Sequence, residues 1–204
     1  IRNNEQLGWV SPRLQKHSIQ VVYRQSQLLN QFATDLLKLQ KGDVSAAGKL
    51  HDESIHEGVK PALLERTVDD DAVVWLADRI NEVEKSTGVF PTIAVLVNNE
   101  SMVQPMAEQL TPHLTNLKAI ACSEGRSLGE GTDVRVFNIR HIKGLEFEAV
   151  FFVGIDQLAI AQPDLFDRYL YVGATRAATY LGLVCHSNLP SKLEPLRGHF
   201  VEAW

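Results

Sequence analysis

Charged residues and a glycine that could bind a phosphate gather in one short stretch of the chain, residues 138–148. The stretch reads Asn-Ile-Arg-His-Ile-Lys-Gly-Leu-Glu-Phe-Glu and contains Arg140, His141, Lys143 and Gly144. Apolar runs that predict buried strands flank it, and open α/β sheets bind ligands at the carboxyl ends of their strands. We therefore expect an anion-binding site here, and the structural alternative is a basic surface turn.

A second candidate is Arg176, which lies in the otherwise small and apolar stretch Tyr-Val-Gly-Ala-Thr-Arg-Ala at residues 171–177. A guanidinium keeps its charge at neutral pH and is poorly tolerated beside apolar surface unless it is paired. Arg176 therefore needs an anion. That anion is either a bound ligand or an acidic neighbour such as Asp167 or Glu146.

Other familiar sites for phosphates and metals are not present in the sequence. It contains neither G-x-x-x-x-G-K-[ST] nor G-x-G-x-x-G after a strand, so the chain cannot build a phosphate cradle of that type by itself. His51 and His56 are five residues apart, whereas two ligands on one helical face are four apart. We expect a solvated loop there and no metal site.

The hydrophobic pattern predicts strands that alternate with helices. The expected strands cover residues 19–23, 62–66, 92–97, 116–122, 134–139, 148–155 and 180–186, and the expected helices cover residues 27–42, 69–88, 102–110 and 165–178. Such alternation implies right-handed crossovers and a largely parallel sheet with helices on both faces. We predict one three-layer α/β domain over residues 1–204, with 1–18 as an opening segment and 187–204 as a closing tail.

Composition narrows the class of protein further. Hydrophobic residues make up 45% of the chain and charged residues 22%, and the formal charge is -5, so any nucleic-acid contact must be local. The longest strongly apolar run, residues 149–155, is too short for a membrane helix. Two well-separated cysteines fit a reducing cytoplasm. The chain begins with Ile1, which suggests a piece of a longer protein.

At these motifs the sequence resembles the C-terminal RecA-like motor domain (2A) of superfamily 1 DNA helicases of the UvrD/Rep type. Residues 143–147 look like helicase motif V, and residues 171–177 look like motif VI. Val-Tyr-Arg-Gln-Ser at residues 22–26 resembles the core of motif IV, and residues 93–97 resemble the strand that follows it. The four elements occur in the family's order and span most of the chain.

The resemblance implies a nucleotide site that this domain would share. In the family, ATP with Mg²⁺ lies between two RecA-like domains, and the second domain offers arginines to the transferring phosphate. By motif match those arginines would be Arg24 and Arg176. Glu146 would help to seat the nucleotide, or would only form an ion pair with Lys143, and Gly144 would let the backbone approach the phosphates.

The resemblance also implies a contact with single-stranded DNA, for which Arg140, His141 and Lys143 are the candidates. The sequence departs from the family pattern in two places, one in the residues of this DNA contact and one in the length of the chain before it. Asn138 and Arg140 stand where the family commonly has Thr or Ser and then His. Only 41 positions separate Val97 from Asn138, too few for the accessory 2B domain, so we expect a compact member without 2B or one whose accessory parts lie elsewhere in the full protein.

The expected function is therefore the C-terminal half of an ATP-dependent DNA helicase, which works with an N-terminal RecA-like domain of the same protein. The isolated chain should be inactive, because its sequence has no Walker A lysine. Two alternatives stay open. The chain could be a non-catalytic RecA-like interaction or regulatory module, or part of a helicase that acts on RNA.

Overall fold

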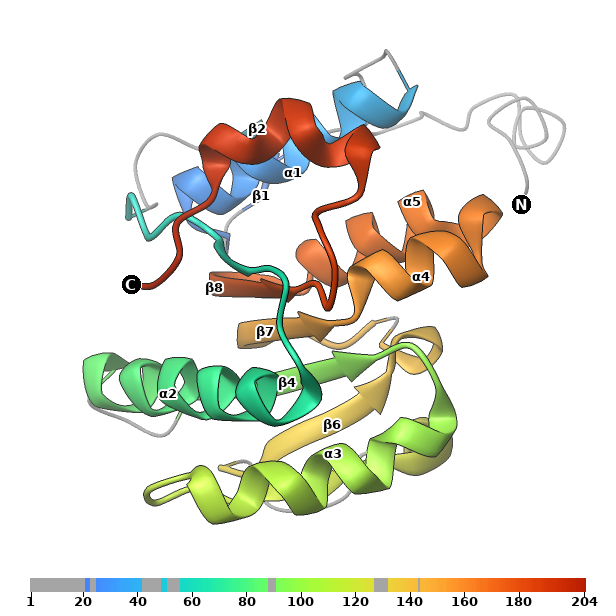
Figure 1. Cartoon of the computed structure of the whole chain (residues 1–204). Helices are drawn as coiled ribbons and strands as arrows, with labels where there is room; N and C mark the ends of the chain where they lie inside the picture. The colour runs from blue at the N-terminus through green and yellow to red at the C-terminus, as the bar shows by residue number, and fades with distance from the viewer. Residues whose placement is uncertain are drawn as a thin grey trace, which may run out of the picture.

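A computed structural model of the chain describes residues 21–22, 25–41, 49–50, 56–87, 91–126, 132–142 and 144–204. Its centre is a six-stranded sheet in the order β3-β8-β7-β4-β6-β5, in which every neighbouring pair is parallel (Figure 1). The strands are β3 (Ala62–Leu64), β4 (Ile93–Val97), β5 (Ala119–Ala121), β6 (Val134–Asn138), β7 (Phe147–Val153) and β8 (Ala177–Val184). The predicted parallel α/β sheet is confirmed.

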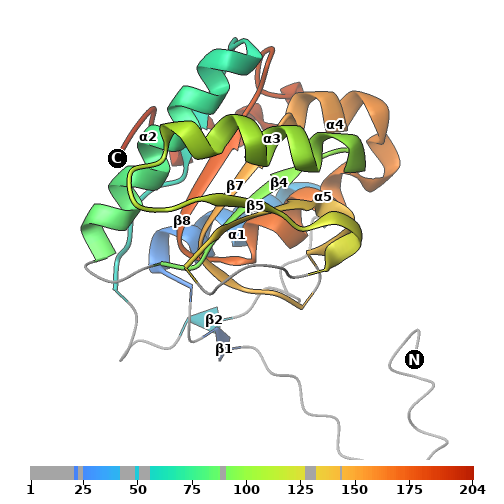
Figure 2. The same ribbon diagram turned by 90° about the horizontal axis from the view of Figure 1, so that it is seen from below.

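Helices cover both faces of this sheet. One layer contains α2 (Asp69–Thr87) and α3 (Val103–Leu110), and the other contains α1 (Gln27–Lys41), α4 (Ile155–Ala161), α5 (Pro163–Ala174) and the 3-10 helix η6 (Ser191–His199), as Figures 1 and 2 show. Alternate residues of β4 face the two layers: Leu96 packs with the α1 side and Val95 with the α2 side. Because both of its faces are buried, β4 is apolar without a break, and the predicted three-layer architecture is confirmed.

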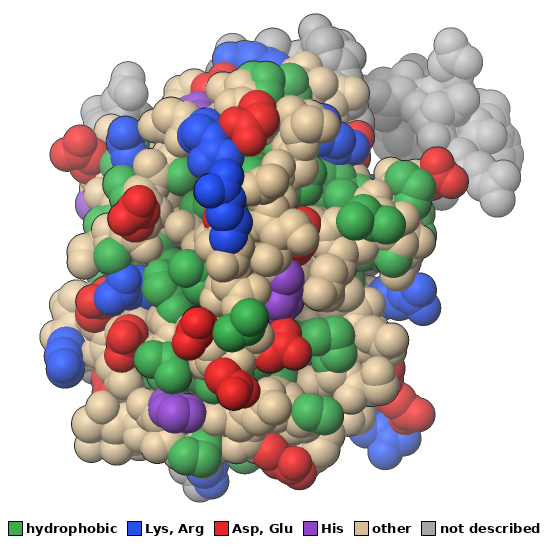
Figure 3. Space-filling view, in the orientation of Figure 1, with side chains coloured by type: hydrophobic (Ala, Val, Ile, Leu, Met, Phe, Trp, Pro, Cys, Tyr) green, Lys and Arg blue, Asp and Glu red, His purple; other side chains and the backbone are tan. Residues whose placement is uncertain are grey.

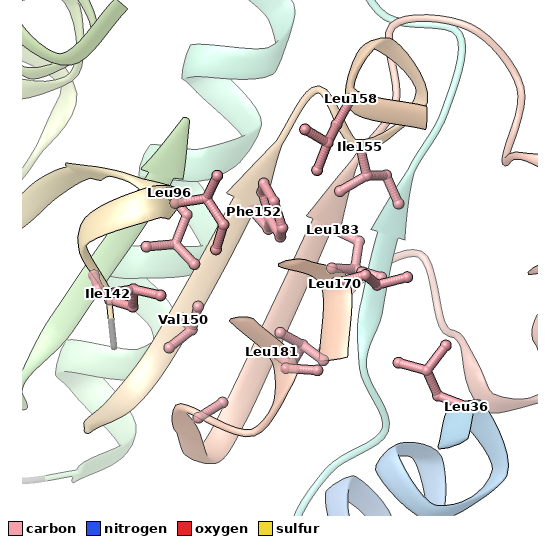
Figure 4. Close-up of a cluster of buried hydrophobic side chains, with 14 of the residues drawn as sticks. Leu36, Leu96, Ile142, Val150, Phe152, Ile155, Leu158, Leu170, Leu181 and Leu183 are labelled. Carbon is pink, nitrogen blue, oxygen red and sulfur yellow. The ribbon is translucent and has the colours of Figure 1, made fainter. Parts of the chain in front are cut away.

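The core beneath α1, α4 and α5 is continuous from one end of the sheet to the other. Leu36, Phe152 and Leu170 come from α1, β7 and α5, and all are fully buried (Figure 4). Cys185 is buried beside the same core, and burial raises the pKa of its thiol, so it acts as a small apolar residue. Cys122 is likewise buried and unbonded to another cysteine.

The predicted helix over residues 165–178 is wrong at both ends. Two helices, α4 and α5, occupy this region, with Pro163 at the start of α5, and the second helix ends at Ala174. The helix cannot continue because Ala177 pairs with Phe147 as the first residue of β8. The preceding strand also ends early, since Gly154 has a left-handed φ of +71°. Tertiary pairing has overridden the local helical pattern.

The expected strand over residues 19–23 is found only in part. Val21–Val22 form β1, which pairs with β2 (Lys49–Leu50) in a separate two-stranded parallel unit outside the main sheet. Residues 19, 20 and 23 lie outside the described residues. Among the described residues, no helix has both the length and the apolar character that crossing a bilayer requires.

The C-terminal tail packs against the sheet and covers its β3 edge. Leu193 and Leu196 of η6 are buried, and Val201 forms a parallel bridge with Ala62. The indole Nε1 of Trp204 donates a hydrogen bond to the carbonyl of Lys60 at 2.8 Å. The tail is therefore part of the packed structure.

An ion pair fixes the tail to β3 and predicts a pH dependence. Arg197 donates hydrogen bonds to Glu65 at 2.7 and 3.2 Å, and this holds the pKa of the Glu65 carboxyl below its ordinary value. A lowered carboxyl pKa stabilises the fold above the unfolded pKa of about 4.3, and the gain is lost as the pH falls through the lower folded value. The wild type should therefore lose stability in urea unfolding as the pH falls from about 5 to about 3. Glu65→Gln should lose less over this range, because its side chain does not titrate.

The exposed Glu194 also bonds Arg197 and provides the matched control, Glu194→Gln. Its effect should be smaller, because exposed ion pairs add little to stability. If the stability of the wild type and of Glu65→Gln changed equally with pH, the ion pair between Glu65 and Arg197 would not be the cause of the pH dependence.

Candidate functional site

Two residues predicted to bind nucleotide, Glu146 and Arg176, line one hollow of about 360 Å³. The hollow lies at the amino edge of the sheet. Its lining includes Thr92, which directly precedes β4, and the first residues of β7 and β8, Phe147 and Ala177. Parallel strand pairing thus brings together residues that are 30 positions apart in the sequence.

Arg176 enters the hollow from the turn between α5 and β8 and is partly buried. Its Nε, Nη1 and Nη2 atoms each have one neutral acceptor at 3.4 Å: the carbonyl oxygens of Val172 and Leu145 and the Thr175 hydroxyl. These are long contacts for hydrogen bonds. They hold the guanidinium in place without neutralising its charge.

The acidic neighbours considered for Arg176 do not neutralise it. Asp167 forms an ion pair with Lys192 instead, so a salt bridge from Arg176 to Asp167 is contradicted. Glu146 lines the same hollow, and the ion pairs found among the described residues do not join it to Arg176. Within the described part of the chain, the positive charge of Arg176 is therefore available to an anion in the hollow.

Gln25 holds the turn that carries Arg176, a role that the sequence did not reveal. Its side-chain amide nitrogen donates to the carbonyls of Ala174 and Ala177 at 3.2 and 3.1 Å, and the side chain is buried. The next backbone amide, of Ser26, donates to Ala178 at 2.7 Å. The only signal in the sequence was the position of Gln25 inside the Tyr-Arg-Gln-Ser match.

Three other predicted residues are not part of the described hollow. Arg24 and Lys143 lie outside the described residues. Gly144 is exposed, does not line the hollow, and has a left-handed φ of +85°. A Cβ added there would meet no atom within 4 Å, so the structure uses this glycine for its backbone conformation.

Arg140 and His141 lie at the opposite, carboxyl edge of the sheet. They belong to the 3-10 turn Ile139–His141, which directly follows β6, whereas Phe147 begins β7 at the amino edge. Because β6 and β7 both pair in parallel with β4, the chain between them must return across the sheet. Figure 4 shows Ile142 of this connection beside Leu96 and Val150.

The expected position of the whole stretch at the carboxyl ends is therefore only half right. It holds for Arg140 and His141 and is wrong for residues 144–148, which lie at or near the amino end of β7. The reason is topological: two parallel strands that are consecutive in the chain must be joined from the end of one to the start of the next.

The two cations at the carboxyl edge have different surroundings. Arg140 is exposed, and its Nη2 donates to the Gln162 side-chain oxygen at 3.4 Å. His141 is also exposed, and its Nε2 lies 3.6 Å from a carboxylate oxygen of Glu100. Arg140 therefore offers its charge outward, while an acidic partner competes for His141.

The residues of the hollow fit one part of a nucleotide and not the whole. Arg176 and the Thr175 hydroxyl suit a phosphate, whereas Glu146 and Glu148 on the same lining suit hydroxyl or amine donors. Among the described residues, no group of three or more His, Cys, Asp or Glu side chains could hold a metal ion. A complete site for ATP and Mg²⁺ thus requires groups from outside these residues.

Comparison with known proteins agrees with this geometry. Residues 133–184, which include Arg140, Glu146 and Arg176, match the family model of the UvrD-like helicase C-terminal domain. Among solved structures, the C-terminal domain of a possible DNA helicase from Lactobacillus plantarum WCFS1 has a similar fold. Its TM-score is 0.60 at 19% identity, over 88% of this chain and 97% of that chain. No curated protein matches the sequence. The family match and the shared fold confirm the resemblance indicated by the motifs, to the C-terminal RecA-like domain of UvrD-like helicases.

Proposed function

We propose that the chain is the second motor domain of an ATP-dependent DNA helicase and that Arg176 is an arginine it contributes to the nucleotide. The observation that carries this proposal is the guanidinium of Arg176 in the amino-edge hollow, whose hydrogen-bond acceptors among the described residues are neutral. Phosphoryl transfer depends chiefly on positioning and on stabilising the charge of the phosphoryl oxygens. A positioned arginine supplies both.

In this proposal the other residues of the hollow have supporting roles. Glu146 accepts hydrogen bonds from the nucleotide, and Gln25 holds the Arg176 turn in position. Arg24 precedes Gln25 in the chain and is proposed as the second cation. Mg²⁺ and the remaining phosphate contacts come from an N-terminal RecA-like domain of the same protein.

The proposed DNA contact is at the opposite edge of the sheet. Arg140 and His141 follow β6 at the carboxyl edge, and Lys143 belongs to the same stretch of sequence. Cations that bind a phosphate backbone give affinity without sequence preference. Placing the two kinds of ligand at opposite edges supports two separate contacts, one with nucleotide and one with single-stranded DNA.

The test of this function is ATP hydrolysis with and without single-stranded DNA. The full-length protein should hydrolyse ATP and should be stimulated by DNA, whereas the purified 204-residue chain should show no hydrolysis above background. In the full-length protein, Arg140→Ala should weaken DNA binding and lower the slope of log affinity against log salt by about 1.

Arg126 provides a matched control, because it is exposed, follows the neighbouring strand β5 and is paired with Glu124 at 3.2 Å. Arg126→Ala should leave DNA binding nearly unchanged. Helicase-like turnover by the isolated chain would contradict the proposal. A full-length protein that neither binds nor hydrolyses ATP would favour the non-catalytic module.

A further inference from the structure

Helices α2 and α3 lie on the face of the sheet away from α1 and α5 (Figure 2), and residues of both helices line a groove between them. Two hollows of about 200 and 390 Å³ form it, and they share Val73 and Gln109 as lining residues. None of the described residues proposed to contact nucleotide or DNA lines it. We refer to these two hollows together as the α2–α3 groove.

The floor and walls of the α2–α3 groove are largely apolar. Val73 and Met106 are buried at the bottom, Met102 is partly exposed, and Val74 has 45% of its surface exposed. Met102 and Met106 are the two methionines of the whole chain. Methionine is unbranched and polarizable, and it suits surfaces that adapt to an apolar partner.

Polar contacts are found at or near both ends of the groove. At one end, Nε2 of His186 and a carboxylate oxygen of Asp69 are 2.8 Å apart. At the other end, the Asn81 side chain donates to the carbonyl of His113 at 3.1 Å and accepts from the amide of Thr115 at 3.0 Å. On the α3 side the lining residues run from Ser101 to His113, and 12 positions rise about 18 Å in an α-helix, which equals about three turns of a bound helix.

The rim of the groove is acidic. Asp69 and Asp70 line it, and the only charged residue of α3 is Glu108. Arg79 of α2 is paired with Glu82 at 2.5 Å and lies over the Trp75 ring, beside a different hollow. In Figure 3, acidic and hydrophobic side chains are interspersed over α2 and α3, and the Lys and Arg side chains lie around them.

These features select one class of partner. The carboxylates repel phosphate, so neither a nucleic acid nor an anionic membrane fits the groove. An apolar floor between two helices suits the apolar face of a third helix, and an acidic rim suits cations on that helix. We propose that the α2–α3 groove binds a Lys/Arg-rich amphipathic helix of a partner protein.

The probe for this proposal is a synthetic helical peptide of about 14 residues, with Leu along one face and Lys on the other. The 204-residue chain should bind it in a fluorescence anisotropy titration, with amide shift changes in NMR spectra confined to α2 and α3. A scrambled peptide of the same composition and a Leu/Glu peptide should bind at least about tenfold more weakly, a difference of about 1.4 kcal/mol.

Matched substitutions separate the groove from general attraction to an acidic protein. Val74→Lys should weaken peptide binding at least about tenfold, because it places a cation in the apolar wall. Leu39→Lys changes an equally exposed apolar residue on α1, with 41% of its surface exposed, and should have less than about a twofold effect. Asp70→Asn should weaken binding more than Asp164→Asn at the start of α5.

Equal losses for Val74→Lys and Leu39→Lys would overturn the proposal, as would equal binding of the scrambled peptide. Sedimentation equilibrium of the chain without peptide measures its oligomeric state, and so tests whether a second copy of the chain occupies the groove. A dimer that Val74→Lys dissociates would also overturn it. The proposal does not depend on ATP or DNA binding, so it can fail or hold independently of the proposed function.

Discussion

Arg176→Ala should lower ATP hydrolysis by the full-length protein about 1000-fold, the size of effect that a transition-state arginine supplies. Nucleotide affinity should change by less than about tenfold, because the lost interaction is made mainly in the transition state. Single-turnover hydrolysis, measured beside equilibrium binding of a fluorescent ATP analogue, separates the two quantities. The expectation rests on the unneutralised guanidinium in the amino-edge hollow.

Two further variants make this result specific. Arg176→Lys keeps the charge but loses the planar fork, so hydrolysis should remain strongly impaired. Arg168→Ala removes an exposed arginine from α5, the helix that precedes Arg176, outside the hollow, and should leave hydrolysis within about twofold of the wild type. Equal losses of binding and turnover in Arg176→Ala would instead mean that Arg176 has a structural role.

Gly173→Val should destabilise the chain by about 2 kcal/mol, within the range for overpacked cores. Gly173 faces the sheet from α5. A Cβ at this position would lie 3.2 Å from Cδ1 of Phe152 and 3.3 Å from Cδ1 of Leu96, and the two methyl groups of valine would come closer still. Urea unfolding of the 204-residue chain measures the change.

The same substitution should also reduce ATP hydrolysis by the full-length protein, by about tenfold. The amide of Arg176 donates to the carbonyl of Gly173 at 3.1 Å, so displacing α5 from the sheet moves the arginine, and small misplacements are costly in catalysis. Gly198→Val is the matched control, because a Cβ there meets no atom within 4 Å. If both valine variants were equally stable, close packing at Gly173 would not explain the presence of glycine.

The elements with strong local signals could be predicted from the sequence. Three aspartates and a helical spacing of apolar residues place α2, and the unbroken apolar run of β4 indicates a strand buried on both faces. The end of α5 could not be predicted. It depends on the pairing of Ala177 with Phe147, which the local sequence does not contain.

The candidate site was predictable as a set of residues but not as an arrangement. Motif spacing identified Arg176 and Glu146, and the structure places both at one hollow. The motif spacing gave no indication that Arg140 lies at the carboxyl edge of the sheet, opposite the hollow. The two edges are defined only once the strands are paired in parallel. The role of Gln25 was hidden for the same reason, since its acceptors lie about 150 positions away.

The connection between β6 and β7 has a mechanical consequence. Only eight residues join Asn138 to Phe147, and three of the described ones are held in place: Ile142 is fully buried, its amide donates to the carbonyl of Ile139, and the Leu145 amide donates to the carbonyl of Ile142. Such a segment cannot lengthen without breaking these bonds or exposing Ile142 to water. We therefore expect a load applied at Arg140 to be passed through this connection to the sheet and its core.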